Sequence, residues 1–100
     1  MGRKNKKTEQ YEVRARIVKG LAHPTRMLLV DELLRWKERC VCDLTAAVGA
    51  DISTVSKHLL VLKKAGLVSD EKRGQMVFYS ARTEHVKGFL KFIECCLRCS

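Results

Sequence analysis

The sequence predicts a mainly α-helical fold with a single β-hairpin, and three observations carry that prediction. Apolar residues recur at three- and four-residue steps in several stretches, which is the spacing of amphipathic helices. Near residue 67 the pattern changes to alternation of apolar and polar residues, which is typical of strands. The chain has 100 residues, enough for one domain that buries roughly two-thirds of its extended-chain surface, so a second copy would add to the core.

The charge of the chain is strongly positive and unevenly distributed. The formal net charge is +9, and residues 1–20 hold seven Lys and Arg against two Glu. This imbalance predicts a polyanionic partner, either nucleic acid or an anionic membrane surface. No apolar run approaches the roughly 18 residues of a membrane span, and the start lacks the apolar core of a signal peptide. We therefore expect a cytoplasmic protein without a membrane partner, with a basic disordered arm over residues 1–8 and one domain over residues 9–100.

The first helix is expected over residues 8–20, where apolar residues recur at four-residue steps. Its stripe consists of Val13, Ile17 and Leu21. Pro24 suits the first position of a second helix, because the N–H that proline lacks would be unsatisfied there. That helix runs to about Trp36. We interpret His23, just before it, as a local cap or packing residue.

The next segment predicts a helix-turn-helix. Residues 38–44 lead into a short helix, expected over Thr45–Val48, and a tight turn leads to a longer one over residues 53–65. Ser53 is expected to cap the longer helix, and Gly66 to close it. One face of this helix is apolar, and the opposite arc carries hydroxyl and lysine side chains. Such a helix suits a protein core on one side and a DNA major groove on the other.

Beyond Gly66, residues 67–72 and 76–80 alternate as two strands of a hairpin would. A helix-turn-helix followed by a hairpin is a winged helix. The predicted tip carries Arg73 and Gln75, which suit contacts with a neighbouring minor groove or its phosphates. A last helix is expected over residues 83–97. Its broad apolar stripe predicts packing on the first helix and on a second subunit.

Five cysteines fall in two clusters: Cys40 and Cys42, then Cys95, Cys96 and Cys99. In a chain without an export signal, an odd number of cysteines indicates free thiols for metal or redox chemistry rather than a disulfide framework. Thiolates bind soft acceptors such as As(III), Cu(I), Cd(II) and Zn(II). At 100° per residue from His85, Cys96 falls at about 20° and Cys99 at about −40°. His85 therefore shares their helical face and is an additional candidate ligand.

Three segments resemble the ArsR/SmtB family of small metal-sensing repressors: HPTRMLLVDELL (23–34), ERCVCDL (38–44) and STVSKHLLVLKKAGLV (53–68). The resemblance implies a homodimer of winged helix-turn-helix domains, in the order α-α-α-α-β-β-α, with the first and last helices at the dimer interface. It also implies that the inducer-free protein binds double-stranded operator DNA at an inverted repeat and that an inducer releases it. The implied DNA-facing residues are Ser53, Thr54, Ser56, Lys57 and His58 on the recognition helix, with Arg73 and Gln75 on the wing.

The chain departs from arsenic-responsive members of the family at Thr45, where they carry a third cysteine. It also has Thr83 in place of an Asp of the family's interfacial zinc site, although His85, Cys96 and Cys99 keep that site's spacing. We expect the cysteine thiolates to bind a soft metal(loid) inducer, As(III) being the leading candidate, and no cofactor to be required for DNA binding. The expected ligands are drawn from Cys40, Cys42, Cys95, Cys96 and Cys99, with His85 in addition.

Several alternatives remain open from the sequence. Redox- or persulfide-sensing relatives pair a cysteine near residues 38–44 with one near the end of the last helix, and this chain has candidates at both places. A thiol oxidoreductase is less favoured, because the Cys-x-x-Cys of residues 96–99 lies at a helix end and not beside a βαβ unit. A winged helix that binds protein instead of DNA is disfavoured by the basic recognition face. We do not expect an enzyme. The sequence leaves open the inducer (Sb(III) included), the operator and whether the two cysteine clusters form one site.

Overall fold

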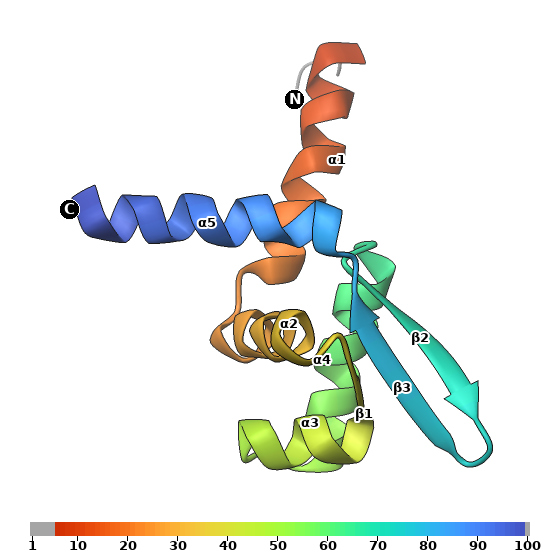
Figure 1. Cartoon of the computed structure of the whole chain (residues 1–100). Helices are drawn as coiled ribbons and strands as arrows, with labels where there is room; N and C mark the ends of the chain where they lie inside the picture. The colour runs from red at the N-terminus through yellow and green to blue at the C-terminus, as the bar shows by residue number, and fades with distance from the viewer. Residues whose placement is uncertain (1–5, 100) are drawn as a thin grey trace.

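The computed structural model describes residues 6–99 as five helices and a small antiparallel sheet (Figure 1). The elements are α1 (Lys6–Leu21), α2 (Pro24–Trp36), β1 (Glu38–Cys40), α3 (Val41–Val48), α4 (Ile52–Lys64), β2 (Val68–Arg73), β3 (Met76–Ala81) and α5 (Thr83–Cys99). The predicted winged helix-turn-helix fold is confirmed: α3 and α4 form the helix-turn-helix, and β2 and β3 form the wing.

A single apolar core fixes the orientation of the three central helices. Fully buried side chains come from α2, α3, α4, the segment that leads into the wing and the start of α5: Leu29, Val30, Leu33, Leu44, Val55, Leu59, Leu62, Leu67, Val68 and Val86. On α4 these are the positions of the predicted apolar face. Because that face is turned into the core, the opposite face of α4, which carries hydroxyl and lysine side chains, is left in solvent.

The sheet contains one strand that the sequence did not predict. Its strand order is β1-β3-β2, and β1 pairs antiparallel with β3 so that Cys40 lies opposite Phe78. β1 has only three residues, too few to show alternation, and it depends on β3 for its hydrogen bonds. The wing is thereby joined to the segment directly before α3.

The starts of α1, α3 and α4 differ from the sequence prediction. α3 begins at Val41 and not at Thr45, so Cys42 and Asp43 lie in its first turn. It ends as predicted at Gly49, whose φ of 75° is left-handed. α1 begins at Lys6, so residues 6–8 of the predicted basic arm are helical, and the remainder of that arm lies outside the described residues.

Helices α1 and α5 extend away from the core, and α5 projects sideways from the body of the molecule (Figure 1). Both carry large apolar side chains in solvent, including Tyr11 and Val18 on α1 and Phe92 and Leu97 on α5. Gly20 lets α1 approach α4, since a Cβ at this position would lie 2.8 Å from the Cβ of Ala65. None of the described helices is long and apolar enough to cross a membrane.

Candidate nucleic-acid interface and thiol sites

The N-terminal end of α4 presents a run of short polar and basic side chains to solvent. Ser53, Thr54, Ser56 and Lys57 are all exposed, while Val55 between them is fully buried. These four predicted DNA-facing residues therefore lie together on one accessible surface. We call it the reading face.

The cap of α4 is Asp51, so the prediction of Ser53 as the cap is wrong. The Thr54 amide donates to Asp51 Oδ1 at 2.7 Å, and the Ser53 hydroxyl donates to the same oxygen at 3.3 Å. Hydrogen bonds from Thr54 are the largest cause of a lowered pKa of the Asp51 carboxyl. The helix begins one residue earlier than expected, at Ile52, because a carboxylate one residue before it is the stronger acceptor for its first free amides.

His58 is placed differently from the other predicted contacts on α4. Its half-buried ring lies against His23 at the start of α2, with ring centroids 4.3 Å apart and planes inclined by 42°. The pKa of His58 is lowered by burial first, and then by the neighbouring His23 and Arg26. His23 acts as the predicted local cap, since its Nδ1 accepts a hydrogen bond from the Thr25 amide at 3.1 Å.

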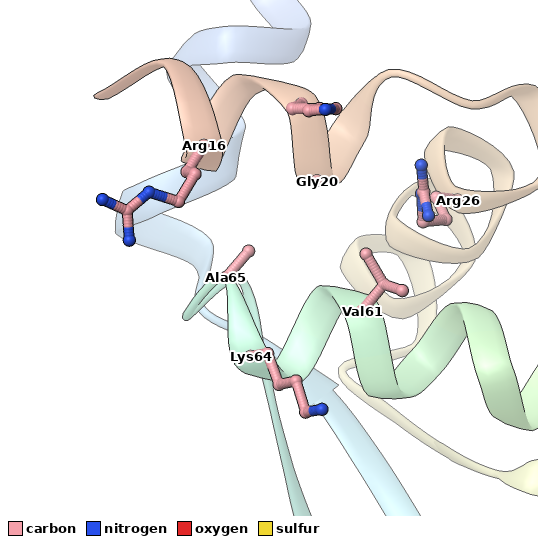
Figure 2. A pocket seen from close by; sticks show the side chains of 7 residues that line it. Arg16, Gly20, Arg26, Val61, Lys64 and Ala65 are labelled. Atoms are coloured by element: carbon pink, nitrogen blue, oxygen red, sulfur yellow. The ribbon is translucent and has the colours of Figure 1, made fainter. Parts of the chain in front are cut away.

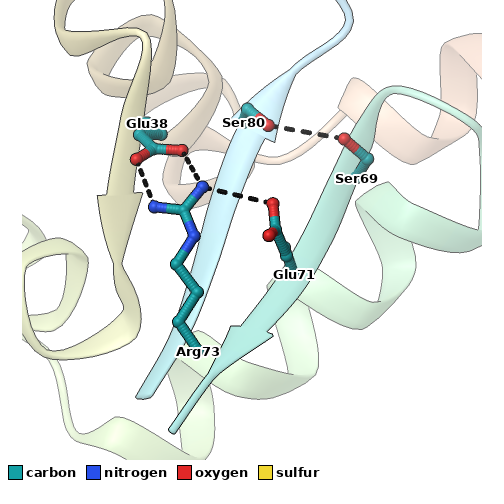
Figure 3. Close-up of polar contacts among 5 residues, drawn as sticks. All are labelled: Glu38, Ser69, Glu71, Arg73 and Ser80. Carbon is teal, nitrogen blue, oxygen red and sulfur yellow. Dashed lines mark hydrogen bonds and ion pairs between the residues drawn. The ribbon is translucent and has the colours of Figure 1, made fainter.

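Of the two predicted contact residues on the wing, one is exposed and the other is engaged by hydrogen bonds within the protein. Gln75 is exposed at the turn beside Gly74, whose φ is 63°. Arg73 instead donates two hydrogen bonds to Glu38 on β1, at 2.6 and 3.0 Å, and one to Glu71 at 3.2 Å (Figure 3). These contacts lower the pKa of Glu38 and raise that of Arg73. The Arg73 charge is therefore neutralised within the protein.

The first cysteine pair lies at the junction of β1 and α3. Cys40 is 4% exposed and ends β1, and Cys42 is exposed in the first turn of α3. Both line a cavity of about 280 Å³. The other lining residues come from α3, α4 and the wing: Val41, Ile52, Ser56, Gln75, Met76 and Val77. We call this space the thiol cavity. It joins both cysteines to one residue of the reading face and to the tip of the wing.

The second cysteine cluster lies at the exposed end of α5. Cys95, Cys96 and Cys99 are all exposed free thiols, and Arg98 Nη2 lies 3.5 Å from Cys95 Sγ. His85 is at the other end of the helix, where its Nδ1 donates to the Gly66 carbonyl at 3.1 Å. Eleven residues of helix separate His85 from Cys96, about 16 Å along the axis. One protomer therefore cannot offer both side chains to a single ion.

Within residues 6–99, no three His, Cys, Asp or Glu side chains are grouped closely enough to hold a metal ion. A three-thiolate site would require rearranged α5 thiols or donors from a second protomer. Sequence reasoning also missed Asp51 and Glu38, together with the apolar residues that line the thiol cavity: Val41, Ile52, Met76 and Val77. Asp51, two residues before Ser53, was visible in the sequence. That Cys42 and Met76 line one cavity depends on the pairing of β1 with β3.

Comparisons with known proteins agree with this geometry. Residues 23–70 match a family model described as "Bacterial regulatory protein, arsR family". The chain is 35% identical over 86 residues to an uncharacterized HTH-type transcriptional regulator of Methanocaldococcus jannaschii, covering 86% of this chain and 97% of that protein. It is also 35% identical over 79 residues to an arsenical resistance operon repressor of Bacillus subtilis, covering 79% of this chain and 75% of that protein.

Among solved structures, the chain is similar to a homodimeric winged helix-turn-helix DNA-binding domain from Mycobacterium bovis, a possible ArsR-family transcriptional regulator. The TM-score is 0.82 at 28% sequence identity, and the match covers 97% of this chain and 89% of that one.

Proposed function

Because the chain belongs to the ArsR family and is a DNA-binding transcriptional repressor of that family, we propose how it reads DNA and what releases it. It binds an inverted-repeat operator as a homodimer. It is released when cysteine thiolates bind a soft metal(loid), for which As(III) is the leading candidate. The single observation that carries this proposal is the thiol cavity, because Cys40 and Cys42 line the same space as Ser56 and Gln75.

The reading face supplies the contacts with base edges in the major groove. Ser53, Thr54 and Ser56 offer hydroxyls and Lys57 a charge, all on an exposed surface of a helix whose other side is fixed in the core. Gln75 at the free tip of the wing reaches the neighbouring backbone or minor groove. His58 packs against His23, so its role is to position α4 and not to contact bases directly.

Dimerisation uses the two helices that extend from the core. Exposed apolar side chains on α1 and α5, up to 71% exposed at Leu97, are a surface that a second copy would bury. Two copies related by a two-fold axis then present two reading faces, which matches an operator made of inverted half-sites about one helical turn apart.

Ligand capture at the thiol cavity acts directly on both DNA-contacting elements. A ligand drawn to Cys40 and Cys42 must fit between α4 and the tip of the wing, and it displaces or pulls on Ser56 and Gln75. The bound state therefore disfavours the geometry that fits DNA. A coupling of about 1–3 kcal/mol between the two sites is the usual size for such regulation.

As(III) takes up to three thiolates, and the thiol cavity offers two. The exposed end of α5, with three thiols within five residues, is the second place where arsenite is captured. The alternative function is redox or persulfide sensing by the same cysteines. The exposure of four of the five free thiols favours it, since access to the thiolate governs that chemistry as well.

The test is operator release by defined thiol-reactive ligands. An operator is selected from random duplex DNA, and fluorescence anisotropy follows its release by As(III), Sb(III), Cd(II), Zn(II), Cu(I), persulfide and peroxide. The same titrations are repeated on Cys42→Ser and on Cys95/Cys96/Cys99→Ser. We expect As(III) to release the wild type and one of the two variants to lose this response. Undiminished release from both variants, or no release of the wild type by any ligand, would contradict the thiol mechanism.

A further inference from the structure

A second hollow lies toward the C-terminal end of α4, away from the reading face. It has a volume of about 320 Å³ and is bounded by α1, α2 and α4 (Figure 2). Its lining consists of Gly20, Val61 and Ala65 together with Arg16, Lys19, Arg26 and Lys64. We call it the basic groove. Lys64 is eight residues beyond Ser56, about 12 Å along the helix axis, so the basic groove continues along α4 from the reading face toward the C-terminal end of the helix.

The floor of the basic groove is small and apolar. α1 comes so close to α4 that a Cβ on Gly20 would lie 2.8 Å from the Cβ of Ala65. Figure 2 shows Ala65 and Val61 directed toward the space beneath Gly20. Val61 is 38% exposed, so this apolar surface is in contact with water. A floor of this kind favours a ligand with an apolar body.

The rim of the basic groove is cationic and contains no acidic side chain. Four basic residues from three helices line it, and no Asp or Glu does. Basic side chains elsewhere in the described part of the chain, such as Arg39 and Arg73, lie beside carboxylates. Lys63, for example, lies 3.0 Å from Asp70, while its neighbour Lys64 lines the groove. A group of like charges without counter-charge attracts anions.

Arg26 offers a hydrogen-bond donor that is already removed from solvent. Its Nε is buried and has no hydrogen-bond partner among the described residues. A buried donor without an acceptor is destabilising, so the Arg26 guanidinium would gain by turning toward an acceptor oxygen in the groove. The imidazoles of His23 and His58 near Arg26 are basic groups, so they supply no anionic partner either.

The groove also lies on a different side of α1 from part of its exposed apolar surface. At 100° per residue, Arg16 and Gly20 fall between about 140° and 180° from Tyr11 and Val18. A partner that packs on Tyr11 and Val18 therefore leaves this side of α1 open.

We propose that the basic groove binds a small organic carboxylate, with its apolar body on the floor and its carboxylate at Arg26, while Lys64 adds to the positive potential of the rim. A guanidinium and a carboxylate form paired hydrogen bonds in a fixed geometry, which suits Arg26 to this role. Arg16 and Lys64 point away from the floor in Figure 2 and are assigned no direct contact. The bound carboxylate connects α1 and α2 to the recognition helix without involving any cysteine.

The test uses the full-length protein without DNA, with benzoate as the probe. Amide chemical shifts are followed by NMR at fixed ionic strength, with benzamide as the neutral isostere and inorganic phosphate as an anion without an apolar body. Benzoate is expected to shift the amides of Gly20, Val61 and Ala65 saturably. Benzamide and phosphate are expected to bind about tenfold more weakly, because each lacks one half of the recognition. Equal binding of either control overturns the proposal, as does a response centred on residues 53–57.

Variants separate this site from general charge effects. Arg26→Gln is expected to weaken benzoate binding about tenfold and Lys64→Gln about threefold, whereas Lys72→Gln on the wing removes the same charge without effect. Lys64 is exposed, so Lys64→Gln decides the question if Arg26→Gln unfolds the protein. Equal losses in Lys64→Gln and Lys72→Gln, or none in Lys64→Gln, overturn the proposal. Release of Lys64→Gln from DNA by As(III) tests the thiol mechanism separately.

Discussion

The guanidinium of Arg73 donates two hydrogen bonds to the carboxylate of Glu38, at 2.6 and 3.0 Å, across 35 residues of sequence. This pair joins the wing to the strand that ends at Cys40. The same guanidinium lies 4.8 Å from the centroid of the Phe78 ring. A side chain that the sequence assigns to DNA is thus engaged in holding the wing against the thiol-bearing segment.

Glu38→Gln is expected to release Arg73 and to strengthen operator binding several-fold at low salt, since the freed guanidinium gains access to phosphates. The cost to stability should be small, because the pair is exposed to solvent and screened by it. Anisotropy titrations and urea unfolding measure the two effects. Glu84→Gln, an exposed acid on α5, makes the same change in net charge and is the control. Equal strengthening in both variants would mean that only net charge matters.

Lys57→Ala is expected to weaken operator binding by about 1–3 kcal/mol and to lower the salt dependence by about one unit of slope, because one cation leaves the interface. Ser56→Ala should weaken binding at the selected operator and leave nonspecific binding unchanged. The measurement is operator affinity over a range of salt concentrations. Lys91→Ala on α5 removes the same charge away from the reading face, and its affinity should match the wild type. An unchanged affinity of Lys57→Ala would remove this residue from the interface.

Stability is expected to fall in mildly acidic solution because of His58. Its pKa in the folded protein is lowered below the ordinary value near 6.5, so the unfolded chain takes up the proton more readily. The contribution of His58 to stability is therefore fully present above about pH 6.5 and is lost as the pH falls from there through the folded-state pKa. Urea unfolding at pH 7.5 and 5.5 should show a smaller loss for His58→Gln than for the wild type. An identical loss in both would indicate that other groups control this range.

The two cysteines of the thiol cavity are expected to differ in their tolerance of serine. Cys40→Ser places a hydroxyl in a position that is 4% exposed and should cost about 1–3 kcal/mol unless the hydroxyl finds a partner. Cys42 is exposed, so Cys42→Ser should stay within about 0.5 kcal/mol of the wild type. Thermal unfolding of both variants, free of metal, measures the difference. Equal stabilities would place the Cys40 side chain in solvent.

Most of the fold could be predicted because its signals are local. Gly49 and Gly74 adopt the positive φ angles that end α3 and turn the wing, and the apolar positions of α4 are buried as their spacing indicated. β1 could not be predicted in this way, since three residues show no period and their hydrogen bonds come from β3. The start of α4 was misplaced because both Asp51 and Ser53 suit a cap, and only the folded backbone shows which side chain accepts from Thr54.

In the candidate site too, local features could be predicted from the sequence and tertiary contacts could not. The exposed hydroxyls and lysine of the reading face could be read from helical spacing, and the pairing of two cysteines was visible in the sequence. The engagement of Arg73 by Glu38 and the placement of His58 against His23 could not, because each joins residues that lie 35 positions apart in the chain. Residues that suit DNA by type are thus engaged by tertiary contacts within the protein.

The unequal burial of Cys40 and Cys42 sets an order of events for the proposed sensor. An incoming thiophile meets exposed Cys42 first, at a rate that rises with its concentration. The second bond, to Cys40, requires the backbone between β1 and α3 to open locally. The rate of that opening does not depend on the ligand concentration. Release from DNA should therefore show a fast phase whose rate rises with ligand concentration, followed by a slower phase whose rate reaches a maximum. Bond formation to the buried Cys40 is therefore the step that limits the rate of release.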